Sequence, residues 1–262
     1  MSEKQYNNPY SISQNFLTCK KTIRRLISKT TLSPNDTVLE IGAGKGHITK
    51  ALSETCRVIS YEIDKNLYSK LKPQLNSNVR LYCRDFLKCA LPRAPYKVFA
   101  NIPFSKTSEI VRKLTLSDNP PEAIWLIMEK GAAKRFMGVP KENVGSLSLK
   151  PFFDVRIVWH FDRRDFHPAP SVDAVLLEMK LKKSFDLPYS QRYNFRAFLE
   201  HGQGGMLRLR KLLTQKQIST ALKLEHLPQI PPSGDLSYVQ WLCLFRCWLK
   251  FRGDTKENRR RS

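Results

Sequence analysis

A glycine-rich turn between a predicted strand and a predicted helix constrains the fold of this chain more than any other feature. Residues 40–46 read Glu-Ile-Gly-Ala-Gly-Lys-Gly, after a strand pattern at 37–41 and before a helix pattern at 47–54. Glycines in such a turn let the backbone approach a ligand closely and leave helix N–H groups pointing at it. A Walker loop is excluded because Gly46 follows Lys45, and a dinucleotide fingerprint because His47 stands in place of its third glycine.

Strand and helix patterns alternate around this turn, which predicts βαβ units and a mainly parallel, doubly wound α/β sheet. Thr18 is the expected N-cap of a first helix. Two late strands, at 155–161 and 174–181, have no helix between them and are expected to form an antiparallel pair that closes the sheet. The other strands are predicted at 37–41, 57–63, 79–83, 96–100 and 123–129, and the helices at 19–29, 47–54, 67–75, 106–114 and 130–137.

The later part of the chain has a different character. Residues 182–190 read as a linker, and the apolar spacing at 193–200, 206–224 and 238–251 is helical. A cluster of Gly202, Gly204 and Gly205 is expected to interrupt a helix. We therefore predict a first domain over residues 1–181, a smaller helical domain over 182–251 that binds nucleic acid, and a disordered basic tail over 252–262.

The net charge of the chain indicates what kind of partner it binds. Lys and Arg number 45 against 23 Asp and Glu, a net charge of +22. Such a charge attracts polyanions, of which nucleic acid and anionic membrane are the common ones. The most apolar stretch, at 239–251, is too short to span a bilayer and is broken by Arg246 and Lys250.

Location and metal content are also constrained. The N-terminal residues lack the apolar run of a signal peptide, so we expect a cytoplasmic protein. Six cysteines without a C-x-x-C pair suit reduced thiols rather than a metal site, and no metal is expected.

Acidic side chains follow two of the predicted strands. Glu62 lies 20 residues beyond Gly42, at the end of the second strand of the alternation. This is the offset at which an acidic side chain meets ribose hydroxyls in such folds. Asp85 follows the third strand, where a carboxylate can accept a hydrogen bond from an adenine amino group. Because ligands of open α/β sheets bind at the carboxyl ends of the strands, these residues are candidate ligand contacts.

The motif Asn101-Ile102-Pro103-Phe104 after the fourth strand predicts chemistry on adenine. Adenine N6 is a poor nucleophile because its lone pair is delocalised into the ring. A site that methylates it can hold both N–H bonds with acceptors, here the Asn101 side-chain oxygen and the Ile102 carbonyl, so that the lone pair points at the methyl group. Pro103 fixes the backbone that presents this carbonyl. Phe104 would stack on a base extruded from its helix.

These motifs, together with residues 13–17 (Ser-Gln-Asn-Phe-Leu) and 166–173 (Phe-His-Pro-Ala-Pro-Ser-Val-Asp), resemble the ribosomal RNA adenine N6-methyltransferases. Within that superfamily the chain looks like the Erm family, because it has NIPF instead of NLPY and Leu-Ile-Met-Glu-Lys-Gly-Ala-Ala-Lys-Arg at 126–135. The resemblance implies a Rossmann-like methyltransferase domain that uses S-adenosylmethionine. It implies transfer of one or two methyl groups to N6 of one adenine in 23S rRNA, with resistance to macrolides, lincosamides and streptogramin B.

The resemblance also implies roles for individual residues. Asn15 and Leu17 would close over the cofactor and Gly42 would lie against its methionine part. Glu62 would hold the ribose and Asp85 the adenine amino group. Asn101 would lie where cofactor and target base meet. Phe166 would form the second aromatic wall of the base pocket, opposite Phe104, which stands where the superfamily often has Tyr.

Basic residues are expected to contact the RNA mainly through its phosphates. The candidates are Lys134, Arg135, Arg163, Arg164, Arg208 and Arg210, with Arg112, Lys113, Lys141 and Lys211. We expect a monomer. Two other functions stay open: a small-subunit rRNA adenine dimethyltransferase, and a non-catalytic nucleic-acid-binding protein with the same fold.

Overall fold

The computed structural model describes residues 15–231 and 234–258. The chain divides into two compact units. The first runs to Lys134 and resumes at Phe153–Lys182, and the second contains Arg135–Phe152 and the chain from Lys183 onward. The predicted boundary after residue 181 lies close to Lys182, whereas residues 135–152, which are predicted in the first domain, belong to the second unit. The binding role of the second part stays a prediction.

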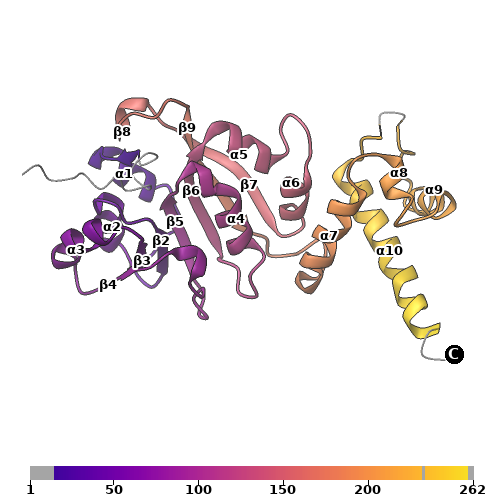
Figure 1. The fold of residues 1–262 in the computed structure, drawn as a ribbon, viewed down its shortest axis with the longest axis horizontal. Helices are drawn as coiled ribbons and strands as arrows, with labels where there is room; N and C mark the ends of the chain where they lie inside the picture. Colours follow the sequence, from indigo (N-terminus) through magenta and orange to yellow (C-terminus); the bar gives the residue numbers. More distant parts are fainter. Residues whose placement is uncertain (1–14, 232–233, 259–262) are drawn as a thin grey trace, which may run out of the picture. The chain divides into compact units, whose positions relative to one another are not determined.

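The first unit is built on a sheet of seven strands within the described residues, in the order β4-β3-β2-β5-β6-β9-β7 (Figure 1). Neighbouring strands from β4 to β6 are parallel, and β9 is antiparallel to both β6 and β7. The predicted antiparallel pair is therefore confirmed. The strands are β2 (Thr37–Ile41), β3 (Arg57–Glu62), β4 (Val79–Cys83), β5 (Lys97–Asn101), β6 (Ala123–Glu129), β7 (Phe153–His160) and β9 (Ala174–Leu181).

Three helices connect successive parallel strands, as the alternation predicts: α2 (His47–Ser53), α3 (Lys65–Leu71) and α4 (Thr107–Thr115). Helix α1 (Lys20–Ile27) precedes β2, and α5 (Lys130–Met137) follows β6, beginning in the first unit and ending in the second. Short 3-10 turns are η2 (Lys72–Gln74), η3 (Phe86–Lys88), η4 (Phe104–Lys106) and η5 (Arg163–Asp165). A small antiparallel pair, β1 (Phe16–Leu17) with β8 (Phe166–His167), was not predicted.

The first helix differs from its prediction at its start. Cys19 is the N-cap of α1 and makes no side-chain capping bond. Thr18 is not the cap, because its backbone N–H donates to the Asp165 carbonyl at 2.9 Å. The Thr18 hydroxyl also faces that carbonyl, at 3.4 Å. A contact with a residue 147 positions away overrides the local capping preference, which is the usual way tertiary structure overrules propensity.

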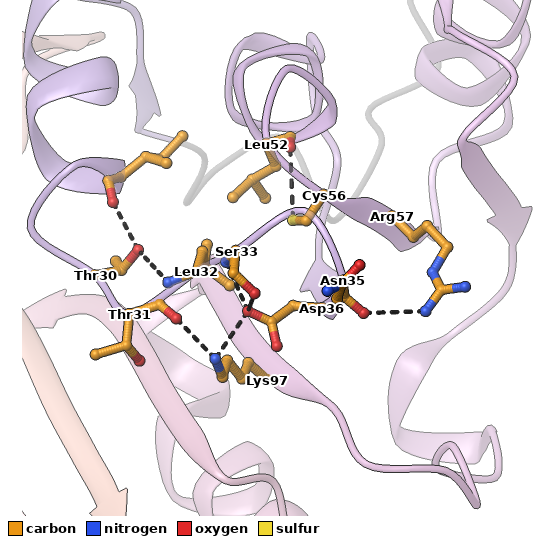
Figure 2. Close-up of polar contacts among 11 residues, drawn as sticks. Thr30, Thr31, Leu32, Ser33, Asn35, Asp36, Leu52, Cys56, Arg57 and Lys97 are labelled. Carbon is orange, nitrogen blue, oxygen red and sulfur yellow. Dashed lines mark hydrogen bonds and ion pairs between the residues drawn. The ribbon is translucent and has the colours of Figure 1, made fainter.

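Figure 2 shows how the loop between α1 and β2 is fastened to the sheet. Lys97, the first residue of β5, donates to the Thr31 carbonyl at 2.7 Å and to the Asp36 carboxylate at 2.8 Å. Ser33 donates to the same carboxylate through its backbone N–H and its hydroxyl. Burial raises the pKa of Asp36, but the bonds from Lys97 and Ser33 outweigh this and leave that pKa lowered. These contacts fix the amino ends of β2 and β5. The carboxyl ends of the two strands lie at the opposite edge of the sheet, where ligands of such sheets bind.

The second unit is helical. Its elements are α6 (Val144–Leu149), η6 (Tyr189–Gln191), α7 (Arg192–Gly202), α8 (Met206–Leu209), α9 (Gln215–Leu224) and α10 (Tyr238–Asn258). Its aromatic core includes Phe198 and Phe245, whose ring centroids lie 5.5 Å apart. The glycine cluster does end a helix, since α7 stops at Gly202 and Gly204 and Gly205 both have positive φ.

Three predictions about the second unit need correction. The segment 206–224 is two helices, because Thr214 starts α9 with a reciprocal capping box to Gln217. The helix α6 was missed. The tail expected from residue 252 continues α10 and is helical through Asn258; residues 259–262 lie outside the described chain.

Three features of the described residues concern membranes, metals and thiols. None of their helices is long and apolar enough to cross a membrane. They contain no group of three or more His, Cys, Asp or Glu side chains that could hold a metal ion. All six cysteines are free thiols. The thiol of Cys243, for example, is buried, and its Sγ donates to the Ala221 carbonyl at 3.4 Å.

Candidate functional site

A cavity of about 600 Å³ opens in the first unit at the carboxyl ends of the parallel strands. The loops that follow β2, β3, β4 and β5 line it, together with β1. It brings together nine of the ten residues predicted for catalysis and cofactor binding: Asn15, Leu17, Gly42, Glu62, Asp85, Asn101, Ile102, Pro103 and Phe104. Residues that are far apart in sequence meet here because parallel strands present their carboxyl ends at one edge of a sheet.

The glycine-rich turn supplies one wall of the cavity through its backbone. Gly42 has a φ of 80°, and its N–H donates to the Tyr61 carbonyl at 2.9 Å, which ties the turn to β3. Gly44 has a φ of 56°, and a Cβ there would lie 2.7 Å from Cε1 of Phe16. A side chain at position 44 would therefore be strained and would displace the aromatic ring that covers the turn.

Glu62 is buried at the end of β3, with 3% of its surface exposed. Its two carboxylate oxygens accept backbone bonds from Gly44 at 2.7 Å and from Asp64 at 2.9 Å. Each carboxylate oxygen can accept a second bond. The side chain is thus held rigidly and still has lone pairs for ligand hydroxyls.

Asp85 follows β4 and caps η3 by accepting from the Leu87 N–H at 2.9 Å. Lys113 of α4 holds the same turn, because its ammonium donates to the carbonyls of Leu87 at 2.9 Å and Cys89 at 2.5 Å. The Lys113 nitrogen also lies 5.2 Å from the centroid of the Phe86 ring. Lys113 was expected to contact RNA, but its ammonium is engaged within the protein.

Asn101 is the last residue of β5 and is half-buried. Its side-chain nitrogen donates to the Asn15 carbonyl at 2.7 Å, so its oxygen remains as an acceptor. After it the chain turns through Pro103, with a φ of −60°, into η4. Phe104 is half-buried there, and its carbonyl accepts from the Thr107 hydroxyl at 2.9 Å. The motif thus places an amide oxygen and an aromatic ring beside one cavity.

Glu40 belongs to the glycine-rich motif but had no predicted role. It is 1% exposed, and its Oε2 accepts from the hydroxyls of Thr49 at 2.7 Å and Ser60 at 2.6 Å. Its Oε1 has no hydrogen-bond partner among the described residues. Burial raises its pKa to about 7, and nearby Glu62 adds to this, against the hydrogen bonds from Ser60 and Thr49. The sequence does carry a sign that Glu40 is buried, because it is an acidic residue inside the otherwise apolar strand pattern at 37–41.

Phe166 is the one predicted residue of this set that does not line the cavity in the described chain. It is 4% exposed and pairs with Leu17 across β1 and β8. Its ring packs edge-on against Phe161, with centroids 5.2 Å apart. The structure therefore places Phe166 beside β1, paired with Leu17, which lines the cavity.

Nine of the ten candidate RNA contacts are exposed, and the tenth, Lys113, is half-buried. Lys134 and Arg135 are neighbours on α5. On η5, Arg164 pairs with Asp162 at 2.7 Å and Arg163 with Asp173 at 3.4 Å. In the second unit, Arg208 and Arg210 lie in and directly after α8. Exposed cations of this kind can reach phosphates, and their binding to RNA stays a prediction.

The cavity fits a nucleoside that carries an amino-acid tail. Glu62 offers acceptors for ribose hydroxyls and Asp85 an acceptor for an adenine amino group. Gly42 leaves room beside the turn, since a Cβ there would have only the Asn101 carbonyl near it, at 4.0 Å. These acceptors, and the space beside Gly42, suit S-adenosylmethionine, which carries ribose hydroxyls, an adenine amino group and a methionine tail.

Comparison with known proteins points the same way. The family model described as ribosomal RNA adenine dimethylase matches residues 5–223. An rRNA adenine N-6-methyltransferase of Bacillus anthracis is 30% identical over 93% of this chain and 88% of its own length. An rRNA adenine N-6-methyltransferase of Enterococcus faecalis is 31% identical over 94% of this chain and 99% of its own. The crystal structure of the 23S rRNA methyltransferase ErmE superposes with a TM-score of 0.75 at 27% identity, covering 89% of this chain and 99% of that one.

Proposed function

Because this chain belongs to the ribosomal RNA adenine dimethylase family, we propose that it methylates N6 of one adenine in 23S rRNA, with S-adenosylmethionine as methyl donor. Such a modification would confer resistance to macrolides, lincosamides and streptogramin B. The similarity to ErmE and to rRNA adenine N-6-methyltransferases supports the choice of substrate. We further propose that the protein acts in the cytoplasm as a monomer.

The observation that carries this proposal is the position of Asn101 in the cavity. Its nitrogen is engaged by the Asn15 carbonyl, so its oxygen is the atom left to accept a bond from the adenine amino group. The Ile102 carbonyl would accept the second N–H. Holding both N–H bonds on acceptors favours a pyramidal N6, whose lone pair is withdrawn from the ring and directed at the methyl donor. After N6 accepts the methyl group, it releases one of these protons to solvent.

The remaining residues position the reactants. Pro103 fixes the turn that presents the Ile102 carbonyl, and Phe104 stacks on the extruded base. S-adenosylmethionine, when bound, supplies the electrophilic methyl group. Gly42, Glu62 and Asp85 would hold it. The rate then depends on orientation and electrostatics, and no general base of tuned pKa is required.

Asn15, Leu17 and Phe166 act together at the cavity wall. Asn15 and Leu17 line the cavity, and Phe166 pairs with Leu17 on the neighbouring strand. We assign Phe166 the role of a positioning residue, in place of the aromatic wall that the resemblance implies.

Mass-spectrometric mapping of rRNA from bacteria with and without the protein tests the proposal. The expected result is methylation at N6 of one adenine in 23S rRNA. Modification confined to 16S rRNA would assign the protein to the small-subunit dimethyltransferases. Tight, salt-sensitive RNA binding with no transfer of labelled methyl would identify a non-catalytic binding protein.

A further inference from the structure

One helix of the first unit exposes only cations among its charged side chains. Helix α1 buries Ile23, Leu26 and Ile27, so the intervening positions face outward. Residues 15–35 contain five cations and no Asp or Glu. All five are exposed: Lys20, Lys21, Arg24, Arg25 and, just past the helix, Lys29.

This arrangement is unfavourable for the helix itself. Lys20 and Lys21 occupy the first turn, where the positive end of the helix dipole disfavours cations. Lys21, Arg25 and Lys29 follow one another at spacings of four residues, which places like charges on one row. Local stability therefore does not account for the charge of α1, whereas a bound polyanion would neutralise it.

Few of these cations are neutralised within the protein. Arg24 pairs with Glu54 at 3.1 Å, in a pair whose side chains are 67% and 54% exposed. Exposed pairs of this kind contribute little. No ion pair is recorded for Lys20, Lys21, Arg25 or Lys29 with any residue in the described part of the chain.

The contacts of α1 with Trp159 indicate which part of a nucleic acid would bind. The Arg25 guanidinium lies 4.8 Å from the centroid of the Trp159 ring, and the Lys29 nitrogen lies 5.6 Å from it. Both cations lie over the ring, where they compete with a base for stacking on it. The surface therefore suits phosphates, which are read by charge and not by sequence.

The surface adjoins the cavity. Leu17 of β1 lines the cavity, and only two residues separate it from α1. The Thr22 hydroxyl donates to the Asp165 carboxylate at 2.8 Å, which holds α1 beside η5, near β8 (Figure 1).

We propose that the exposed face of α1, with Lys20, Lys21, Arg24, Arg25 and Lys29, binds the phosphate backbone of the rRNA segment that carries the target adenine. The inference rests on the proposed function for the identity of the polyanion. None of these five residues was among the RNA contacts predicted from the sequence.

The test measures binding of a 23S rRNA fragment at several salt concentrations for the variant Lys20→Gln/Lys21→Gln. The substitutions should retain the fold, because glutamine is a good helix former and because cations in the first turn are unfavourable to the helix dipole. We expect affinity to fall about tenfold at physiological salt, and the log–log salt slope to shrink by about 1.5, for two lost phosphate contacts. Cofactor affinity by calorimetry should not change. The variant Lys20→Arg/Lys21→Arg should bind like the unaltered protein.

The matched control is Lys70→Gln/Arg80→Gln, which removes two exposed charges from α3 and the edge strand β4 of the same unit. An equal loss of RNA affinity in this control would show that only the net charge matters, and it would overturn the proposal that α1 binds the RNA. A salt slope that the α1 substitutions leave unchanged, in an enzyme that still methylates 23S rRNA, would also overturn it. If the unaltered protein methylates no 23S rRNA but its RNA binding still depends on Lys20 and Lys21, the proposed substrate fails and the α1 surface stands.

Discussion

The side-chain nitrogen of Asn101 donates a 2.7 Å hydrogen bond to the backbone carbonyl of Asn15, 86 residues earlier in the chain. The bond fixes the orientation of the Asn101 amide, because the nitrogen is committed and the oxygen remains as the acceptor. It also connects the end of β5 with the segment that leads into β1. One side chain therefore presents an acceptor oxygen at the cavity and anchors the segment that leads into β1.

Replacing Asn101 separates these two roles. We expect Asn101→Ala to lower the single-turnover rate by at least about 100-fold, the scale for loss of a positioned polar group in the transition state. Cofactor affinity should fall several-fold, because Asn15 loses its anchor, while RNA affinity stays within twofold. Asn101→Asp keeps an acceptor oxygen but sets a carboxylate against the Asn15 carbonyl, so it should lose cofactor affinity at least as strongly. Turnover unchanged in Asn101→Ala would refute the catalytic role.

The part of the site that could be predicted from the sequence lies at strand ends. Gly42, Glu62, Asp85 and Asn101 each lie at or just after the carboxyl end of a strand, and parallel strands end at one edge of a sheet. Strand pattern and turn residues are local properties, so they predict which loops meet without any knowledge of the packing.

The parts that could not be predicted depend on contacts between distant residues. The ammonium of Lys113 reaches the carbonyl of Leu87, 26 residues away, and a lysine in an amphipathic helix gives no local sign of this. Phe166 is buried because β8 pairs with β1, a pairing two residues long. Thr18 meets the Asp165 carbonyl and does not cap its own helix. In each case a partner chosen by tertiary structure decides the role.

Lys113 should act on cofactor binding through the turn that carries Asp85. In Lys113→Met the apolar stem is kept, but the carbonyls of Leu87 and Cys89 lose their donor, at a cost of about 1–3 kcal/mol. We expect cofactor affinity to fall about tenfold and RNA affinity to stay the same. Isothermal calorimetry with S-adenosylmethionine measures the first, and filter binding with an rRNA fragment the second.

Arg112→Gln is the matched control, because Arg112 is the exposed neighbour on the same helix and carries the same charge. It should leave cofactor affinity unchanged. Equal loss of cofactor affinity in the two variants would mean that cofactor binding depends on the charge of α4 and not on the bonds from Lys113 to the η3 turn.

Glu40 should make stability depend on pH. Its carboxyl has a pKa raised to about 7 by burial, above the unfolded value of 4.5. A raised folded pKa means that the stabilising contribution is fully present below pH 4.5 and is lost as pH rises through 7. The difference corresponds to about 3 kcal/mol. Relative to Glu40→Gln, which cannot ionise, the unaltered protein should lose roughly this much free energy of unfolding between about pH 5 and pH 9.

Urea unfolding of both proteins across that range measures the effect. Comparing their difference at each pH removes the contributions of all other titrating groups. Parallel curves for the two proteins would show that Glu40 is ionised in the folded state and that its buried oxygens are stabilised in another way.

Gly44 should be indispensable for the shape of the turn. In Gly44→Ala the φ of 56° becomes strained and the new Cβ meets the Phe16 ring at 2.7 Å, so the turn or the ring must move. We expect a loss of about 1–3 kcal/mol in stability and at least tenfold in cofactor affinity, because Gly44 also donates its N–H to Glu62. Gly204→Ala, at a φ of 110° in the second unit, imposes comparable strain away from the cavity. It should destabilise the protein and leave cofactor affinity intact, so a similar loss of affinity in both variants would argue against a specific role for the turn.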